Sequence, residues 1–244
     1  MFKGGTCLKK CYFESYRFSE DLDFTVTNLD KISPKLLNSI FSDIAEWIYD
    51  NSGIELMLDR SNFVEYQNPR ENISCQGKIF YRGPITPSAP QQIPRIKLDI
   101  STDELLVEKP VMRKITHPYS DYQDEFFKIY CYSYAEVFAE KIRALAERTR
   151  PRDLYDVISF FRRPESKDIA IKVKAILSKK CTFKDIPVPT ALSLLKHKDE
   201  CYAGWEQQLA HQLQDLPSFS VFWDELGEFF KWLKNNQINN DLFE

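Results

Sequence analysis

Two aspartates one residue apart are the side chains of this sequence that most directly indicate chemistry. Asp21 and Asp23 lie in "DLDFTV" (21–26), where apolar and polar residues alternate as in a strand with one buried face. Side chains at i and i+2 of a strand share a face, about 6.6 Å apart along it. Two such carboxylates repel each other unless a cation lies between them, and their oxygens suit Mg²⁺. The pair predicts a Mg²⁺ site, although a solvated polar strand face shows the same pattern.

A third carboxylate occupies a similar position further along the chain. Asp99 lies in "RIKLDIS" (95–101), on the polar side of a second alternating segment. If the two strands are neighbours, three carboxylates converge. Three carboxylates around two Mg²⁺ ions can support in-line phosphoryl transfer, because the ions stabilise the attacking and the leaving oxygen. The alternative is an exposed aspartate paired with Lys97 or Lys109.

A glycine pair precedes the acidic strand by fewer than twenty residues. Gly4 and Gly5 permit positive φ and close approach of the backbone. Their N–H groups, together with the Thr6 hydroxyl, could hold a phosphate at the start of a helix. Turns use glycine often, so the motif gains meaning only from the acidic pair that follows it.

A lysine on an apolar helix face is the fourth feature. The periodicity of 134–148 predicts a helix in which Lys141 falls inside the apolar arc, whereas Glu136, Glu140, Arg143 and Glu147 fall outside it. An inward lysine is costly unless its ammonium meets a carboxylate or a phosphate. The alternative is a side chain whose stem is buried and whose charge reaches solvent.

Two further aspartates follow in "RPRDLYD" (150–156), where Pro151 begins a helix. Asp153 and Asp156 are at i and i+3 and therefore share a face. In the first turn, Asp153 also favours the helix dipole. For Asp156 the alternative to a functional role is an ion pair with Arg152.

The elements that must position these residues differ between the two halves of the chain. Strands are predicted at 21–26, 54–60, 75–83 and 95–101, with a further edge strand in 109–119, a proline-rich loop at 83–94 and a helix at 33–53. Helices are predicted at 134–148, 151–161, 166–180 and 220–235. We therefore expect an α+β fold: a mixed sheet with helices over 1–130, followed by a mainly helical domain over 131–244.

Composition and charge restrict the class of protein. The 244 residues are 43% hydrophobic and carry a net charge of -3, which excludes a disordered chain and a uniformly basic binder. Charge is nevertheless segregated, because 141–180 holds 12 Lys/Arg and 5 Asp/Glu, whereas 199–244 holds 2 and 9. The basic block would suit a phosphate-rich partner, although charge runs are usually solvated helix surface.

The six cysteines include no C-x-x-C pair, and with three histidines they do not predict a zinc site. They are interpreted as reduced thiols of a cytoplasmic protein, with Cys7 and Cys11 able to share a helix face. No apolar run approaches the ~20 residues of a membrane span, and residues 1–8 lack the apolar region of a signal peptide.

Five segments, in their order along the chain, resemble one family: "FKGGTCL", "RFSEDLDF", "KLDI", "AEKIRAL" and "RDLYD". They are similar to the AbiEii-type nucleotidyltransferases, toxins of AbiE-like bacterial toxin–antitoxin and phage-defence systems in the polymerase-β-like superfamily. The resemblance covers roughly residues 2 to 165. It implies a polymerase-β-like core that transfers a nucleoside monophosphate from an NTP, with Mg²⁺ as cofactor and a cognate antitoxin encoded nearby. For some members the acceptor is the 3′ end of tRNA.

The resemblance also implies a role for each motif position. Gly4, Gly5 and Thr6 would form the nucleotide-phosphate loop, Ser19 the serine ahead of the acidic pair, Asp21, Asp23 and Asp99 the metal ligands, Lys141 the nucleotide contact, and Asp153 and Asp156 the closing D-x-x-D. Two alternatives stay open. The same fold could act on a small molecule or a protein hydroxyl. Relatives usually carry a helical segment before the glycine loop, so the chain could also be a truncated, non-catalytic module that binds nucleotide or RNA.

Overall fold

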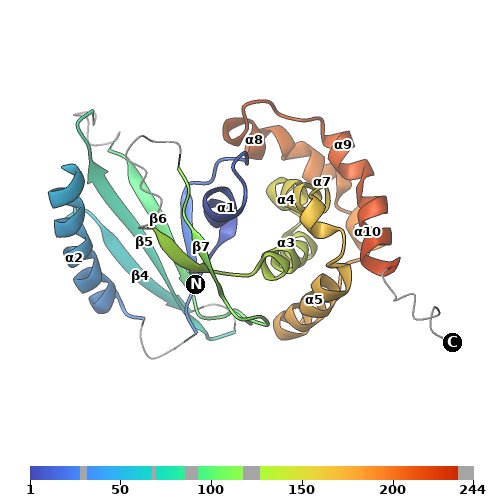
Figure 1. Cartoon of the computed structure of the whole chain (residues 1–244), viewed down its shortest axis with the longest axis horizontal. Helices are drawn as coiled ribbons and strands as arrows, with labels where there is room; N and C mark the ends of the chain where they lie inside the picture. The colour runs from blue at the N-terminus through green and yellow to red at the C-terminus, as the bar shows by residue number, and fades with distance from the viewer. Residues whose placement is uncertain (28–31, 68–69, 86–92, 118–126, 236–244) are drawn as a thin grey trace. The chain divides into compact units, whose positions relative to one another are not determined.

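The computed structural model describes residues 1–27, 32–67, 70–85, 93–117 and 127–235 (Figure 1). It divides into two compact units, which are treated separately below. Unit 1 comprises Met1–Glu104 and Met112–Cys131, and unit 2 comprises Leu105–Val111 and Tyr132–Glu244. None of the described helices is long and apolar enough to cross a membrane.

Unit 1 is built on a mixed sheet. Its strands are β1 (Phe2–Lys3), β2 (Asp21–Thr25), β3 (Glu55–Leu56), β4 (Asn62–Gln67), β5 (Ile73–Arg82), β6 (Arg95–Ser101), β7 (Val111–Lys114) and β8 (Lys128–Cys131). They follow the order β3-β5-β6-β2-β1-β8-β7, and β4 also pairs with β5. The β2–β6 and β1–β8 pairs are parallel, whereas β1–β2 and β5–β6 are antiparallel. The central strands β2 and β6 are those that carry the predicted metal ligands.

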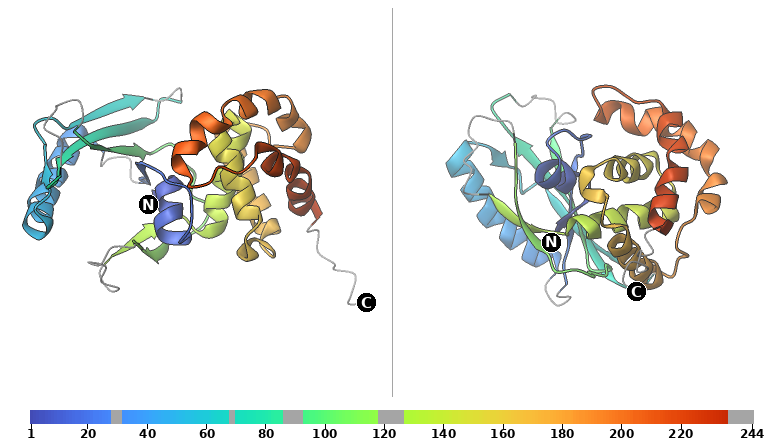
Figure 2. Two further views of the ribbon diagram at one scale, coloured as in Figure 1. Left: turned by 90° about the horizontal axis from the view of Figure 1, so that it is seen from above. Right: turned by 45° about the vertical axis from the view of Figure 1, so that its right-hand side comes forward.

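Helix α2 (Pro34–Ser52) covers one face of this sheet (Figure 2). It begins where the Ser33 hydroxyl accepts a hydrogen bond from the backbone N–H of Leu36, and ends at Gly53 with φ 69°. Its inner side chains join the apolar residues of the central strands. This core comprises Leu37, Phe63, Cys75, Ile79, Leu98 and Ile100, with the partly buried Leu22, Phe24 and Phe41 packed against it. The apolar side of each central strand is therefore buried, and the aspartates face the other way.

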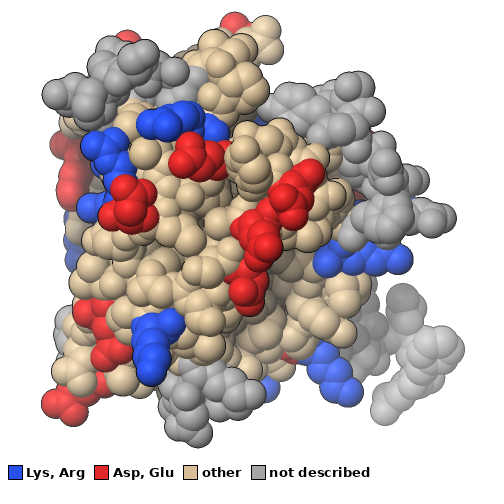
Figure 3. All heavy atoms as spheres, turned by 90° about the vertical axis from the view of Figure 1, so that its left-hand side faces the viewer, with Lys and Arg blue, Asp and Glu red and all other residues tan. Residues whose placement is uncertain are grey.

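The side of α2 that faces away from the sheet is poor in basic residues. Figure 3 shows this face of the molecule with a row of acidic side chains and large uncharged areas. Lys35 is the single basic residue among the 19 residues of the helix, which also exposes Ile40, Trp47 and Tyr49. Helix α2 therefore offers little positive charge to a polyanion.

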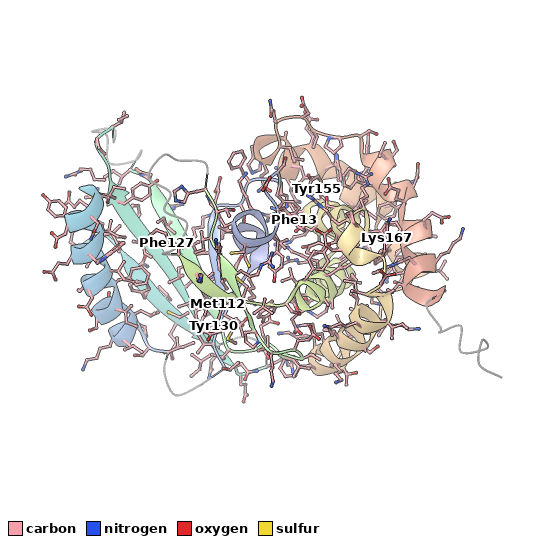
Figure 4. All side chains as sticks on the ribbon, viewed as in Figure 1. Phe13, Met112, Phe127, Tyr130, Tyr155 and Lys167 are labelled. Carbon is pink, nitrogen blue, oxygen red and sulfur yellow. The ribbon has the colours of Figure 1, made fainter. Side chains whose placement is uncertain are left out.

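A short helical segment and the β7–β8 strands complete unit 1. Helix α1 (Gly4–Cys7) continues into a π-helical turn (Leu8–Tyr12), which packs beside β1 and β8. Met112 on β7, Tyr130 on β8 and Phe127 just before β8, labelled in Figure 4, are about half exposed. Because side chains alternate along β8, the exposed Tyr130 places its neighbour Cys131 on the buried side.

Unit 2 is helical. Its helices are α3 (Tyr134–Arg148), α4 (Pro151–Phe161), α5 (Ala170–Lys184), α6 (Ala191–Leu195), α7 (Lys198–Ala203), α8 (Trp205–Leu209), α9 (Phe219–Asp224) and α10 (Leu226–Asn235), with 3₁₀ turns at Pro164–Ser166 and Ala210–Gln212. Aromatic rings join α3, α4 and α10, with ring centroids of Phe138 and Phe160 4.8 Å apart and those of Phe138 and Trp232 5.5 Å apart. The predicted α+β class with C-terminal helices is confirmed.

The helix α3 is buried on more sides than its apolar arc predicted. Glu136 and Arg143 were expected outside the arc, yet 0% and 6% of their surfaces are exposed. The Glu136 carboxylate accepts hydrogen bonds from the backbone N–H groups of Val107 and Glu108, and the Lys180 ammonium lies 2.7 Å from it. Arg143 pairs with acidic residues of its own helix. The expected exposure of these two residues was wrong because charged and hydrogen-bonding partners compensate the cost of burying them. Hydrophobic periodicity contains no information about such partners.

Several element boundaries also differ from the sequence-based prediction. Helices 134–148 and 151–161 and strand 95–101 are confirmed, and the strand predicted at 21–26 ends one residue earlier, at Thr25. The strand predicted at 54–60 stops at Leu56, because the chain turns and the Ser61 hydroxyl bonds back to the Met57 carbonyl. The helix predicted at 166–180 is α5, which begins four residues later, because the buried Ser166 hydroxyl donates to the Phe160 carbonyl and holds a 3₁₀ turn. The helix predicted at 220–235 is divided into α9 and α10 at Glu225, whose carboxylate pairs with Arg162.

Some elements were not predicted. They are β1, β4, β8 and the short helices α6, α7 and α8. Strands of two or four residues and helices of five or six are too short to show a clear period. Strand β4 has six residues, but Phe63 alone among them is buried, so the strand is mostly exposed. The predicted loop at 83–94 is partly outside the described residues, and Gly83–Ile85 and 93–94 carry no helix or strand.

Candidate active site

Two of the predicted metal ligands lie directly opposite each other on neighbouring strands. In the parallel β2–β6 pair, Asp23 is the partner of Asp99, and Asp21 is the partner of Lys97. Neighbouring strands are about 4.8 Å apart. The hypothesis that these strands are adjacent, and that their carboxylates share the face opposite the α2 core, is therefore confirmed.

The surroundings of these carboxylates fit a divalent cation. Oδ1 of Asp21 is itself covered and accepts no hydrogen bond, although 42% of the side chain is exposed and the Lys97 ammonium lies 3.6 Å from this oxygen. The Asp99 carboxylate accepts two long hydrogen bonds, from the Gln76 amide at 3.3 Å and from the Tyr66 hydroxyl at 3.5 Å. A buried carboxylate oxygen without a donor is costly unless a cation or water meets it.

The three carboxylates do not form a closed cage. Among the described residues, no group of three or more acidic side chains brings its ligand oxygens within 4.8 Å of one another. Such an open arrangement suits Mg²⁺, which keeps several waters and completes its shell with substrate phosphates. The assignment of Asp21, Asp23 and Asp99 as its ligands stays a prediction.

The first glycine of the pair lies against the acidic strand. Lys3 pairs with Asp23 across the antiparallel β1–β2 ladder, so Gly4 follows directly beside the Asp23 side chain. A Cβ at Gly4 would lie 1.9 Å from Oδ2 of Asp23, and φ at this residue is 77°. Both the space and the backbone conformation therefore require glycine.

The second glycine brings Ser19 to the same place. A Cβ at Gly5 would lie 2.7 Å from the Ser19 hydroxyl. The Thr6 hydroxyl donates to the Asp21 carbonyl at 2.6 Å and lies 3.3 Å from the Ser19 carbonyl. Thr6 thus ties the helix start to β2, and its contact with a phosphate stays a prediction.

Arg17 is a cation at this loop that was not predicted from the sequence. Arg17 is 3% exposed, and its Nη2 would be 3.1 Å from a Cβ at Gly5. A guanidinium presents several donors to phosphate oxygens. Its position in "SYRFSEDLD" gives no sign of burial, because arginine is usually exposed.

The remaining predicted residues form a buried ion-pair cluster within unit 2. The Lys141 ammonium lies 2.7 Å from Oδ2 of Asp156 and 3.7 Å from Oδ1 of Asp153. Arg148 donates to both carboxylate oxygens of Asp153, at 2.7 and 3.0 Å. Burial opposes the charge of Arg148, but these hydrogen bonds with Asp153 raise its pKa. Helices α3 and α4 are thereby joined through their charged residues.

This cluster distinguishes the two interpretations of Lys141, a buried ammonium or one that reaches solvent. The prediction that it points inward is confirmed, since Lys141 is 8% exposed and Asp156 is 0% exposed. Its charge meets carboxylates rather than solvent, and Lys141 is a partner of Asp156. Contact of Lys141 with a nucleotide stays a prediction.

The basic block is less available than its composition suggested. At least six of its 12 Lys/Arg form ion pairs with acidic residues of unit 2: Lys141, Arg143, Arg148, Arg162, Lys172 and Lys180. Residues with exposed side chains also remain, among them Arg150, Lys174 and Lys179. The segment is therefore only partly a surface for anions.

Replacing Gly4 tests the close approach to Asp23. We expect Gly4→Ala to lower the free energy of unfolding by about 2–5 kcal/mol, because positive φ and overlap with the carboxylate both oppose the methyl group. Denaturant unfolding followed by circular dichroism measures this. Gly53→Ala is the matched control, with φ 69° but open space, and should cost only about 1–2 kcal/mol. Equal losses would show that the Asp23 side chain moves aside freely.

Comparison with known proteins identifies the relatives of this chain. The sequence profile of the nucleotidyl transferase AbiEii toxin family, a type IV toxin–antitoxin system, matches residues 1–232. The fold is similar to that of MenT4, a nucleotidyltransferase toxin from Mycobacterium tuberculosis, with a TM-score of 0.58 and 17% sequence identity. This likeness covers 99% of the chain and 76% of MenT4. None of the curated protein sequences compared with the chain matches it.

Proposed function

Because this chain belongs to the AbiEii nucleotidyltransferase toxin family, we propose that it transfers a nucleoside monophosphate from an NTP to the 3′ end of tRNA. Mg²⁺ is the proposed cofactor, and the proposed setting is the cytoplasm of a bacterium under phage attack. A cognate antitoxin encoded nearby would control it. An acceptor hydroxyl oxygen bonds to the α-phosphorus while the bond to the pyrophosphate oxygen breaks, and the hydroxyl proton is lost.

The observation that carries this proposal is the register of β2 against β6. It sets Asp23 beside Asp99, with Gly4 pressed against Asp23. A phosphate held at this glycine loop would therefore lie next to the proposed metal ligands. Bound Mg²⁺ would neutralise the charge that develops on the attacking and leaving oxygens.

The chain's own residues have distinct proposed tasks. Asp21, Asp23 and Asp99 hold the cation, and the buried, unbonded Oδ1 of Asp21 is the oxygen best suited to it. The Gly4–Gly5 backbone and the buried Arg17 bind the triphosphate. Through its hydrogen bond to the Asp21 carbonyl, Thr6 keeps the loop and the acidic strand together.

The test of this function is transfer of label. The purified protein is incubated with Mg²⁺, total bacterial tRNA and each NTP in turn, labelled at the α-phosphate. Label should enter the RNA for the preferred nucleotide, and removal of the divalent cation by a chelator should stop it. A folded protein that labels nothing would support the alternative of a non-catalytic binding module.

The tRNA acceptor predicts a steep salt dependence. Four to six phosphate contacts, supplied by exposed residues such as Arg150, Lys174 and Lys179, should weaken binding by roughly 10²–10³-fold between 50 and 200 mM salt. Filter binding or fluorescence anisotropy with labelled tRNA measures this. A shallow dependence would instead favour a small-molecule or protein acceptor.

This second candidate has a specific observation in its favour. Half of the basic block forms ion pairs inside unit 2, so fewer charges are left for RNA than the composition implied. Label that enters protein or a small metabolite, with RNA unlabelled, would select it.

A further inference from the structure

Three buried thiols converge at a place that the proposed transferase chemistry does not use. Cys7 lies on α1, Cys11 on the π-helical turn and Cys131 at the end of β8, and their sulfur atoms all lie within 4.8 Å of one another. They are 0%, 7% and 0% exposed. We propose that these three thiolates bind one Zn²⁺ ion.

The separations of the sulfur atoms are near those of a zinc site. Zn–S bonds of about 2.3 Å place coordinating sulfurs roughly 3.8–4.0 Å apart. The observed limit of 4.8 Å requires the sulfurs to approach by about 1 Å or less. Adjustment of side-chain torsion angles suffices for this, without a change in the order of the strands.

The fold, rather than the sequence spacing, brings the thiols together. Cys7 and Cys11 are four residues apart on continuous helical backbone and so share a face. Cys131 is distant in sequence but lies beside them, because β8 pairs in parallel with β1 and Cys131 is opposite Phe2. Such a set lacks the C-x-x-C signal, which explains why the cysteines were interpreted as ordinary thiols.

The surroundings make these cysteines different from the other three. Phe2, Ile115 and Ile129 pack around the group, whereas Cys75, Cys181 and Cys201 do not belong to any such cluster in the described part of the chain.

Charge selects a divalent ion over a monovalent one. Three thiolates with Zn²⁺ leave one negative charge, whereas Cu⁺ would leave two. A nearby cation is Arg113, whose Nε donates to the Cys11 carbonyl at 3.1 Å and whose guanidinium lies 4.4 Å from the Tyr12 ring centre. Burial penalises uncompensated charge, so the smaller net charge of the zinc complex favours Zn²⁺. The fourth tetrahedral position is left to a ligand from outside the protein.

A bound ion would hold the start of the chain's first helix in place. Cys7 follows Thr6 directly, so the proposed zinc site and the glycine pair share α1. Zinc would cross-link this helix to β8 and make the glycine loop more rigid. This cross-link does not depend on the proposed transfer reaction.

The test uses the full chain, purified with reduced thiols and stripped of metal. Equilibrium dialysis against Zn²⁺, with excess Mg²⁺ to occupy the carboxylates, should give one zinc per chain by elemental analysis. The melting temperature should rise by about 5–10 °C at a free Zn²⁺ concentration near 100 times Kd. Cys11→Ser should abolish both effects, whereas Cys75→Ser, a buried cysteine of the same unit, should keep them.

A spectroscopic measurement keeps the proposal testable if the serine variants do not fold. Co²⁺ in the unmutated chain should show the intense near-ultraviolet absorption of thiolate-to-cobalt charge transfer. The proposal is overturned if the folded, reduced protein binds no zinc, if cobalt shows no thiolate band, or if Cu⁺ alone is bound. Retention of zinc by a folded Cys11→Ser variant would also overturn it. None of these outcomes depends on whether label reaches an acceptor.

Discussion

Asp23→Ala should abolish nucleotide transfer while the protein stays folded. Asp23 is the residue to which three features point: it follows Asp21 on β2, faces Asp99 on β6 and lies against Gly4. Loss of a ligand that positions the cation removes several kcal/mol of transition-state stabilisation, so we expect a fall of about 10³-fold or more in kcat/KM. The label-transfer assay measures this.

Stability should change little in this variant. Asp23 and Asp99 are neighbouring carboxylates, and removal of one relieves their repulsion in the absence of a cation. Glu65→Ala is the matched control: Glu65 is exposed on β4 of the same sheet, and its loss should leave both transfer and melting temperature unchanged. An Asp23→Ala protein that retains activity would show that the acidic pair does not hold the catalytic cation, and an unfolded one would make Asp23 structural.

Much of this acidic site could be predicted from the sequence because strand alternation is local. The period of two in 21–26 and 95–101 fixes which face each aspartate occupies, and the structure confirms both strands. The sequence did not predict that these two strands are neighbours; their adjacency had to be assumed. Pairing between residues nearly eighty positions apart leaves no local signal in the sequence.

Other features depended on contacts that no local pattern contains. The burial of Glu136 arises from backbone N–H groups of 107–108, and that of Arg17 from its place beside Gly5. The meeting of Cys131 with Cys7 depends on a two-residue strand. In each case a polar or reactive group is buried by a distant partner, whereas hydrophobic periodicity reports only the apolar faces.

Lys141→Met should destabilise unit 2 strongly. The substitution leaves the Asp156 carboxylate buried without its ammonium partner at 2.7 Å. Breaking such a pair costs about 3–5 kcal/mol of unfolding free energy. Denaturant unfolding measures the loss. Lys172→Met is the control, because Lys172 pairs with Glu108 but its side chain is 53% exposed, and its loss should cost at most about 1 kcal/mol.

The double variant Lys141→Met/Asp156→Leu separates stability from function. It removes both charges together, so most of the lost stability should return, as for other buried pairs replaced by apolar side chains. If Lys141 contacts the nucleotide, as the family resemblance implies, the restored protein should still be at least about 10²-fold less active, since the ammonium no longer stabilises phosphate charge. A double variant that recovers stability and full activity would reduce Lys141 and Asp156 to a structural ion pair. The same result would leave the acidic strand and the glycine loop of unit 1 as the whole of the proposed catalytic apparatus.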